Sequence, residues 1–296
     1  MGRRGRQRLV LPFILPALLV YTIFFVYPAL SAFWVSLHSW SGFGNTMAYV
    51  GLGNYKEMIR DSLFWQACGK TLIISIAGGV GVFGLALFFA GVLQRKLRGA
   101  KFFRALIFFP MVVPGVGLGL IWQFIYNNSW GPLSGILQLL GLTVLDRTWL
   151  GPDLIIPSLT VAVIWTYVGY YLVILLAGVD KIPPPFFESA ILDGASDWRM
   201  FFSITLPMIW DVLVVAIVLW TISSLKIFDL IAATIFPAPV TSAYTITIYI
   251  WSQAIGVYSP VFRLGYASAL GVVLLFMVVI AFGVIRFLTR REAIEY

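Results

Sequence analysis

A polar, helix-competent segment separates two long apolar runs; it covers residues 188–207 and reads ESAILDGASDWRMFFSITLP. Three prolines at 183–185 precede it. Because proline cannot continue a helix but fits its first turn, we expect a new helix to begin near Phe186. That phenylalanine or the next one, together with Ala190 and Ile191, then shares one helix face at i, i+3 and i+4 spacing.

The second half of the segment also has helical character. Gly194 is a natural place for the first helix to end or bend. Trp198, Phe201 and Phe202 supply a second apolar stripe before the next apolar run begins. The pattern predicts a short helix-turn-helix lying across the face of a membrane, although an ordinary amphipathic interfacial loop would show similar features.

Composition places the whole chain in a membrane. Of 296 residues, 60% are hydrophobic and 11% are charged, against about 25% charged in a typical soluble domain. We therefore predict an all-α, polytopic membrane protein. A single cysteine, Cys68, permits no intrachain disulfide, and a single histidine, His38, cannot form a metal site with it.

Six apolar runs are near or above the roughly 17–25 residues that a bilayer requires. The predicted transmembrane helices cover residues 9–37, 71–93, 105–126, 154–179, 210–228 and 264–288. The first run follows four arginines, as in a signal peptide, but it is about twice as long as a signal peptide's apolar region. Its prolines predict kinks. Residues 246–255 are too few to span, and we expect a helix at the outer surface.

The distribution of lysine and arginine predicts the orientation. One set of alternating segments holds fourteen of them: Arg3, Arg4, Arg6, Arg8, Arg95, Lys96, Arg98, Lys101, Arg104, Lys181, Arg199, Arg286, Arg290 and Arg291. The opposite set holds six: Lys56, Arg60, Lys70, Arg147, Lys226 and Arg263. Since cytoplasmic segments carry the excess, both termini and the segment around Glu188 are predicted to be cytoplasmic. This topology accounts for the net charge of +8 without nucleic acid.

One nucleotide-binding motif is incomplete. Gly69-Lys70-Thr71 matches the end of a phosphate-binding P-loop, but the leading glycine is replaced by Phe64 and no strand precedes it. We therefore predict that the chain carries no ATPase of its own.

The spacing of Glu188, Gly194 and Pro207 resembles the cytoplasmic coupling loop of permease subunits in binding-protein-dependent ABC importers. Ser189 replaces a small residue usual in that family. Further segments resemble the maltose-type carbohydrate permeases: residues 50–55, 61–65, 176–179, 182–183, 227–229 and 265–269. The chain is thereby identified as a member of this family.

The resemblance implies one permease domain over residues 1–296, with a coupling loop at 180–208 and core helices over 71–288, in a bacterial or archaeal inner membrane. It implies three kinds of partner besides lipid: a second homologous permease, two copies of a cytoplasmic ATP-binding subunit and an extracytoplasmic solute-binding protein. ATP and Mg²⁺ would be used by the ATP-binding subunit, and this chain would bind no cofactor. The implied coupling residues are Glu188, Ser189, Ala190, Ile191, Asp193, Gly194, Ala195, Ile204, Leu206 and Pro207.

Helical pitch suggests where a solute would pass. One polar and aromatic stripe lies on the fourth span and another on the fifth. The candidate path residues are Thr166, Tyr167, Tyr170, Trp220, Ser223, Ser224 and Ile227. Alternatively, these hydroxyls bond to their own helix carbonyls and the aromatic rings pack between helices.

The nature of the solute is left open by the sequence. The absence of lysine and arginine in the middle of the spans favours a sugar or similar uncharged solute, whereas a polyol or a glycerol phosphate ester remains an alternative. A channel or a membrane-embedded enzyme is a weaker alternative, because the spans offer few ionisable groups.

Overall fold

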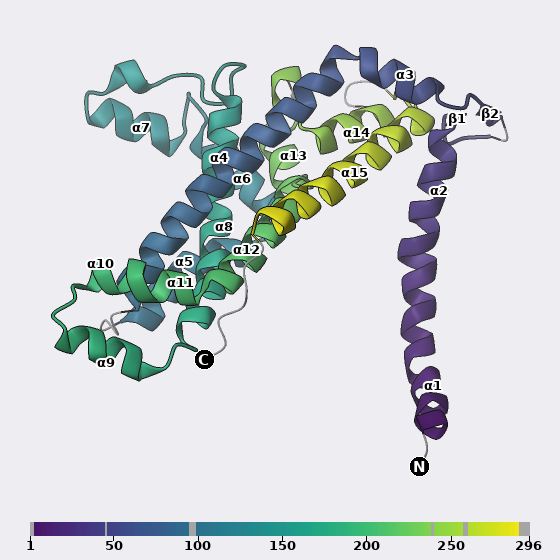
Figure 1. The fold of residues 1–296 in the computed structure, drawn as a ribbon. Helices are drawn as coiled ribbons and strands as arrows, with labels where there is room; N and C mark the ends of the chain where they lie inside the picture. Colours follow the sequence, from purple (N-terminus) through teal and green to yellow (C-terminus); the bar gives the residue numbers. More distant parts are fainter. Residues whose placement is uncertain (1–2, 45, 95–98, 238–239, 257–259, 290–296) are drawn as a thin grey trace. The chain divides into compact units, whose positions relative to one another are not determined.

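The computed structural model describes residues 3–44, 46–94, 99–237, 240–256 and 260–289, and this part of the chain is predominantly helical (Figure 1). It consists of two units: residues 1–64 with 249–276, and residues 65–248 with 277–296. Some cations of the predicted cytoplasmic set lie outside the described residues: Arg95, Lys96, Arg98, Arg290 and Arg291.

The first unit begins with a nearly continuous helix. Its elements are α1 (Arg3–Tyr21), the π-helical turn η1 (Thr22–Val26), α2 (Tyr27–Ser36), strands β1 (His38–Ser39) and β2 (Ala48–Tyr49), α3 (Gly53–Arg60), and parts of α4, α14 and α15. The strands form an antiparallel pair in which His38 faces Tyr49. The Asn54 side chain donates to the carbonyls of Ser36 and His38, at 2.7 and 3.0 Å, and so joins α3 to the end of α2.

The predicted first span is confirmed as a helical run, and residues Pro12–Ser36 are apolar enough to cross a membrane. Pro12 and Pro16 lie inside α1, and a third proline, Pro28, lies in the first turn of α2. The π-helical turn ends two residues before the third proline, consistent with the predicted irregularity. The large exposed apolar side chains of α2 are Tyr27, Leu30 and Trp34.

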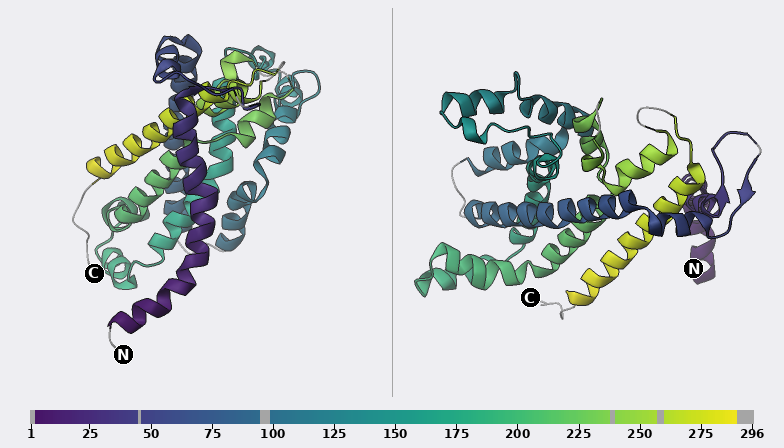
Figure 2. Two further views of the ribbon diagram at one scale, coloured as in Figure 1. Left: turned by 90° about the vertical axis from the view of Figure 1, so that its right-hand side faces the viewer. Right: turned by 90° about the horizontal axis from the view of Figure 1, so that it is seen from above.

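The second unit is built around one central helix, α8. Its complete elements are α5 (Ala100–Val112), α6 (Gly115–Ile125), α7 (Pro132–Leu139), η2 (Thr143–Leu145), α8 (Ile155–Val179), α9 (Pro184–Leu192), α10 (Asp197–Met200), η3 (Phe201–Thr205), α11 (Leu206–Met208), α12 (Trp210–Ser224), α13 (Asp229–Ile235) and η4 (Thr241–Ala243). It also contains the parts of α4 (Ser62–Leu93), α14 (Ile246–Ala254) and α15 (Leu264–Leu288) that lie within 65–248 and 277–296. Fifteen residues of α8 are buried. The views agree that α7 and α9 lie at opposite ends of α8 (Figures 1 and 2).

Four helices of the described chain are long and apolar enough to span a membrane, and two bent pairs bring the number to as many as six. The prediction of one continuous helix over 105–126 was wrong. The chain bends by 97° between α5 and α6. Val113 is extended, with ψ 132°, because the following Pro114 disfavours the helical conformation at the residue before it.

Two other boundaries differ from the prediction. Helix α4 begins nine residues before position 71, because the Asp61 carboxylate caps it by accepting from the Leu63 amide at 2.9 Å. Gly69-Lys70-Thr71 therefore lies within a helix. The fifth span is shorter than expected: α12 ends at Ser224 and follows a 72° bend after Met208. The fourth and sixth spans and the short helix α14 agree with the prediction.

Candidate coupling segment and transport path

Helix α9 forms where the prolines predicted a helix start. Pro183 is extended and occupies the N-cap position, so that Pro184 and Pro185 fill the first turn, where their missing amide protons cost nothing. The helix ends in a Schellman motif. Gly194 has φ +73°, its amide donates to Ile191 O at 3.0 Å, and the Ala195 amide donates to Ala190 O at 2.9 Å. The predicted helix end at this glycine is confirmed.

The second half of the coupling loop is packed against α4. The Ser196 hydroxyl caps α10 by accepting from the Arg199 amide. A Cβ added at Gly91 would lie 2.9 Å from the Trp198 ring and 3.3 Å from the Phe201 ring, so this glycine permits the close approach. The Thr205 hydroxyl donates to the Gln94 amide oxygen at 2.9 Å. Ile204 and Leu206 are half-buried and Pro207 is exposed in this part.

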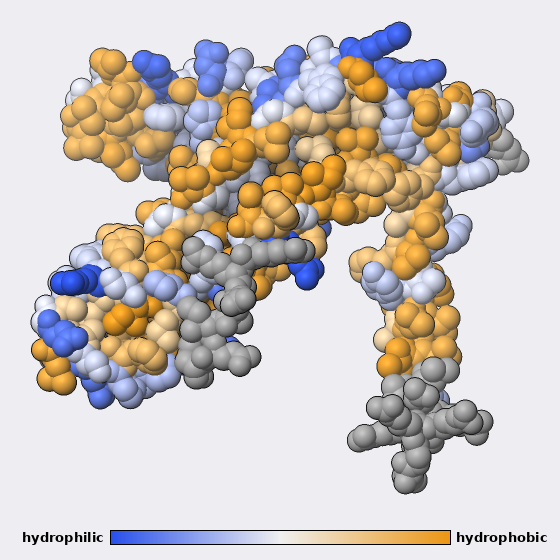
Figure 3. Space-filling model, in the orientation of Figure 1, coloured by the Kyte–Doolittle hydropathy of each residue, from blue (hydrophilic) through white to orange (hydrophobic). Residues whose placement is uncertain are grey.

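Helix α9, in contrast, buries none of its residues. Ile191 is 62% exposed and Leu192 is 89% exposed, although both are large apolar side chains. Glu188, Ser189 and Asp193 are exposed beside them, and Ala190 is half-buried. Figure 3 shows apolar and polar atoms side by side on the surface over α9 and α10. A helix with well-defined ends and exposed apolar side chains is suited to bind a partner protein.

The candidate path residues separate into a packed group and an open group. Thr166 is buried and its hydroxyl donates to Ala162 O at 2.8 Å, in its own helix. Ile227 is also buried. Tyr167 and Tyr170 are half-buried, and Ser223 is exposed. The alternative of a hydroxyl bonded back to its helix therefore describes Thr166, whereas the open group can still face a solute.

Trp220 and Ser224 join α12 to α4. The Trp220 indole donates to Ser75 O at 2.9 Å, and the Ser75 and Ser224 hydroxyls share a hydrogen bond of 2.6 Å. The indole lies against two adjacent glycines, because a Cβ at Gly78 or Gly79 would come within 3.1 or 2.6 Å of it. Both path candidates on this face of α12 are thus packed within the chain.

Aromatic rings gather beside this joint. The Trp220 ring lies edge-on to the Tyr167 and Tyr171 rings, each at 5.8 Å between centroids. Tyr170 is edge-on to Tyr171 at 5.0 Å. Tyr171 and Trp220 are buried and support the two outer rings of this cluster. The half-buried Tyr167 and Tyr170 offer ring faces and hydroxyls, the groups that bind the apolar face and the edge of a sugar ring.

Residues 82–294 match the family described as binding-protein-dependent transport system inner membrane component. The chain belongs to this family. It is 36% identical to the trehalose/maltose transport system permease protein MalF of Thermococcus litoralis, over 74% of each chain. It is 31% identical to the diacetylchitobiose uptake system permease protein NgcF of Streptomyces coelicolor, over 98% of this chain and 86% of the other.

The fold of this permease also matches a solved structure. A chain of the bacterial alginate ABC transporter, in complex with an alginate pentasaccharide-bound periplasmic protein, superposes with a TM-score of 0.84. The match covers 98% of the permease and 96% of that chain, at 22% identity. Identity at this level shows the shared fold. The family match and the named relatives, rather than this structure, confirm the identification made from the sequence.

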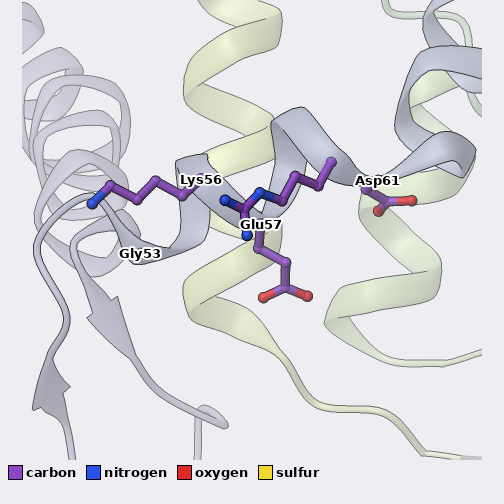
Figure 4. A pocket seen from close by; sticks show the side chains of 5 residues that line it. Gly53, Lys56, Glu57 and Asp61 are labelled. Atoms are coloured by element: carbon purple, nitrogen blue, oxygen red, sulfur yellow. The ribbon is translucent and has the colours of Figure 1, made fainter.

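The permease also has a surface hollow on α3, shown in Figure 4, which is lined by Gly53, Lys56, Glu57, Arg60 and Asp61. Its acidic groups are already engaged. Glu57 accepts from Arg263 at 2.6 and 2.7 Å, and Asp61 accepts from the hydroxyls of Tyr249 and Tyr266. Burial raises the pKa of the Asp61 carboxyl, but these and two backbone hydrogen bonds outweigh it and leave the pKa below 3.8. The charged groups of the hollow therefore hold α3 to α14 and to the start of α15.

Two residues near the path were not in the predicted set. Tyr171 completes the aromatic cluster, and the exposed Asp229 begins α13, two residues after Ile227. The sequence signal for Asp229 was an ionisable residue inside a mainly apolar run. Among the described residues of the permease, no three His, Cys, Asp or Glu side chains are grouped as a metal site would require.

Proposed function

We propose that the permease forms half of the path of an ATP-driven importer for a sugar or a similar uncharged solute. The printed names of two relatives, a trehalose/maltose and a diacetylchitobiose permease, support the solute class. The proposed assembly contains a second homologous permease, two copies of an ATP-binding subunit that uses ATP and Mg²⁺, and an extracytoplasmic solute-binding protein. Both termini of the permease face the cytoplasm.

The observation that carries this proposal is that α9 leaves its large apolar side chains exposed. Ile191 and Leu192 project from a short helix, outside the candidate spans, that also exposes Glu188. We assign α9 to a cleft of the ATP-binding subunit, where its apolar side chains are buried and Glu188 meets a basic residue. The proposed coupling residues all lie on α9 or in the segment that anchors it.

The anchoring contacts explain how movement would pass from the ATP-binding subunit to the spans. The Schellman motif at Gly194 ends α9 and a short link joins it to α10, while Trp198, Phe201 and Thr205 hold the following residues against the end of α4. A displacement of α9 therefore moves α4 with it. Closure of the two ATP-binding subunits would shift the population between inward-facing and outward-facing states.

The proposed path runs beside the aromatic cluster. Tyr167, Tyr170 and Ser223 are the accessible candidates, and Thr166, Trp220, Ser224 and Ile227 lie behind them as supporting residues. Aromatic faces bind the apolar side of a sugar ring while hydroxyl groups bond to its edge. This arrangement supports a sugar more directly than an anionic solute.

Reversal of the charge on α9 tests the proposal. In the complex reconstituted with its partners in proteoliposomes, we expect Glu188→Lys to lower binding-protein-stimulated ATP hydrolysis at least about tenfold, because a like charge would enter the docking cleft. The control is Asp153→Lys. It reverses an exposed charge two residues before α8 begins, at the end of that helix opposite to α9. Stimulation in the control should be normal. Normal uptake and normal stimulation in Glu188→Lys would refute the docking of α9.

A further inference from the structure

Helix α7 turns its polar side chains toward the chain and its apolar side chains away from it. Ser134 and Gln138, one turn apart, donate to the Asp146 carboxylate at 2.6 and 3.1 Å. Successive residues of a helix are about 100° apart, so three large apolar side chains lie on the opposite face. They are Ile136, Leu139 and Leu140. All three are exposed, and Leu139 is 89% exposed. This is the reverse of the pattern of a helix that packs on a core and meets water.

The connection that contains α7 offers few groups that water would solvate. Residues 127–148 carry two charged side chains, Asp146 and Arg147. Three residues shortly after α7, Leu142, Val144 and Leu145, add further exposed apolar side chains. Figure 3 shows hydrophobic surface over α7. An apolar patch of this kind is rare on a surface that meets water, so this face requires an apolar partner.

Hydrogen bonds hold the connection at the start of α8. The Tyr126 hydroxyl donates to Ser158 O at 3.0 Å, and the Ser158 hydroxyl donates to Trp149 O at 2.7 Å. The Tyr126 and Trp149 rings are stacked, at 6.2 Å between centroids. Both ends of the connection are thus tied to one residue of a candidate span. Because α7 lies at the end of α8 opposite to α9 (Figures 1 and 2), it lies at a membrane surface.

Continuity with the surface of a span identifies the apolar partner as lipid. Helix α6 is the second half of a bent pair that can make one span, and it exposes an apolar stripe with four-residue spacing. The stripe consists of Val116, Leu120 and Phe124. The Phe124 ring contacts the exposed Trp130 ring at 5.1 Å between centroids. Tryptophan is enriched where spans meet the membrane surface. The apolar surface of the span therefore continues through Trp130 onto the connection that contains α7.

We propose that α7 is an interfacial anchor whose apolar face is buried in the lipid of the outer leaflet. Protein interfaces carry a polar rim, whereas the surroundings of α7 are apolar and almost uncharged, as a lipid contact requires. The choice of the outer leaflet follows the proposed orientation, in which α9 is cytoplasmic, but burial in lipid does not depend on it. Since the connection is tied to Ser158, the anchor holds the end of α8 at the membrane surface.

Spin labelling tests the proposal in the complex assembled with its partners in proteoliposomes. The label is attached to Leu139→Cys in a Cys68→Ala background. Its collisions are measured with molecular oxygen, which concentrates in lipid, and with a water-soluble nickel chelate. The control is Arg147→Cys, at an exposed, charged position of the same connection. We expect the ratio of oxygen to chelate collisions to be at least about tenfold higher for Leu139→Cys than for the control.

Two outcomes would overturn the proposal. Collisions of the label at Leu139→Cys with the chelate, as frequent as in the control, would show that this face meets water. Protection from both oxygen and chelate would show that a protein covers the face. Repetition without the solute-binding protein would then distinguish that subunit from the second permease. Solute uptake and ATP hydrolysis do not enter these measurements, so the proposed transport function is tested separately.

Discussion

Single glycines determine how closely the helices of the second unit approach. A Cβ built on Gly119 would lie 2.5 Å from the Ala233 Cβ and 2.6 Å from Leu230 O, so α6 and α13 touch backbone to backbone. Gly169 plays the same part between α8 and α5, where a Cβ would lie 2.1 Å from Ile107 O. Small residues at such crossings permit the van der Waals packing that holds helices together in lipid.

Replacement of one glycine tests this packing. We expect Gly119→Ala to destabilise the permease by about 2 kcal/mol, since the added methyl group forces the two backbones apart. Gly117→Ala is the control on the same helix, because its Cβ would meet only Val113 at 3.4 Å. Thermal unfolding in detergent measures both. Equal midpoints for the two variants would contradict the close contact of α6 and α13.

At the scale of elements, the connection that contains α7 is held by one carboxylate. Asp146 accepts from the Ser134 hydroxyl at 2.6 Å and from the Gln138 amide at 3.1 Å. Both donors lie on α7, which otherwise exposes apolar residues such as Leu139. These hydrogen bonds hold the pKa of the Asp146 carboxyl below its ordinary value of 3.8. The ionised Asp146 carboxylate thus stabilises the position of α7.

The lowered pKa predicts a loss of order in acid. A carboxyl whose pKa is depressed in the folded state contributes stability above its unfolded pKa, and this contribution is lost as pH falls through the folded pKa. We therefore expect hydrogen exchange of α7 amides, corrected for intrinsic rates, to accelerate below about pH 4.

Two variants check the assignment to Asp146. Asp146→Asn should exchange faster already at neutral pH and should lose the acid-dependent step. Asp153→Asn, which removes an exposed carboxylate a few residues further along, should behave as the unaltered protein. Retention of the acid step in Asp146→Asn would assign it to another group.

At the scale of the whole molecule, the orientation in the membrane is still a prediction from fourteen cations against six. Reporter fusions after Arg98 and Arg199 should report the cytoplasm, and fusions after Lys56 and Arg147 should report the outside. The cytoplasmic and the outside fusions serve as controls for each other, because the reporter changes sides each time the chain crosses the membrane. A reversed signal at any one of the four sites would contradict the six-span topology, even with the bend between α5 and α6.

The sequence by itself determined the class of protein, the approximate spans, the helix before Gly194 and the family. These follow from apolar runs, prolines and a glycine, whose effects are local to the backbone and independent of neighbours. Only the tertiary structure showed that Trp220 and Ser224 pack on α4, that Ser223 stays open, and that Asp229 lies against Gly115 at the start of α6. The physical reason is that a spanning helix is apolar on every side, so its residue pattern does not reveal which face meets another helix, lipid or water.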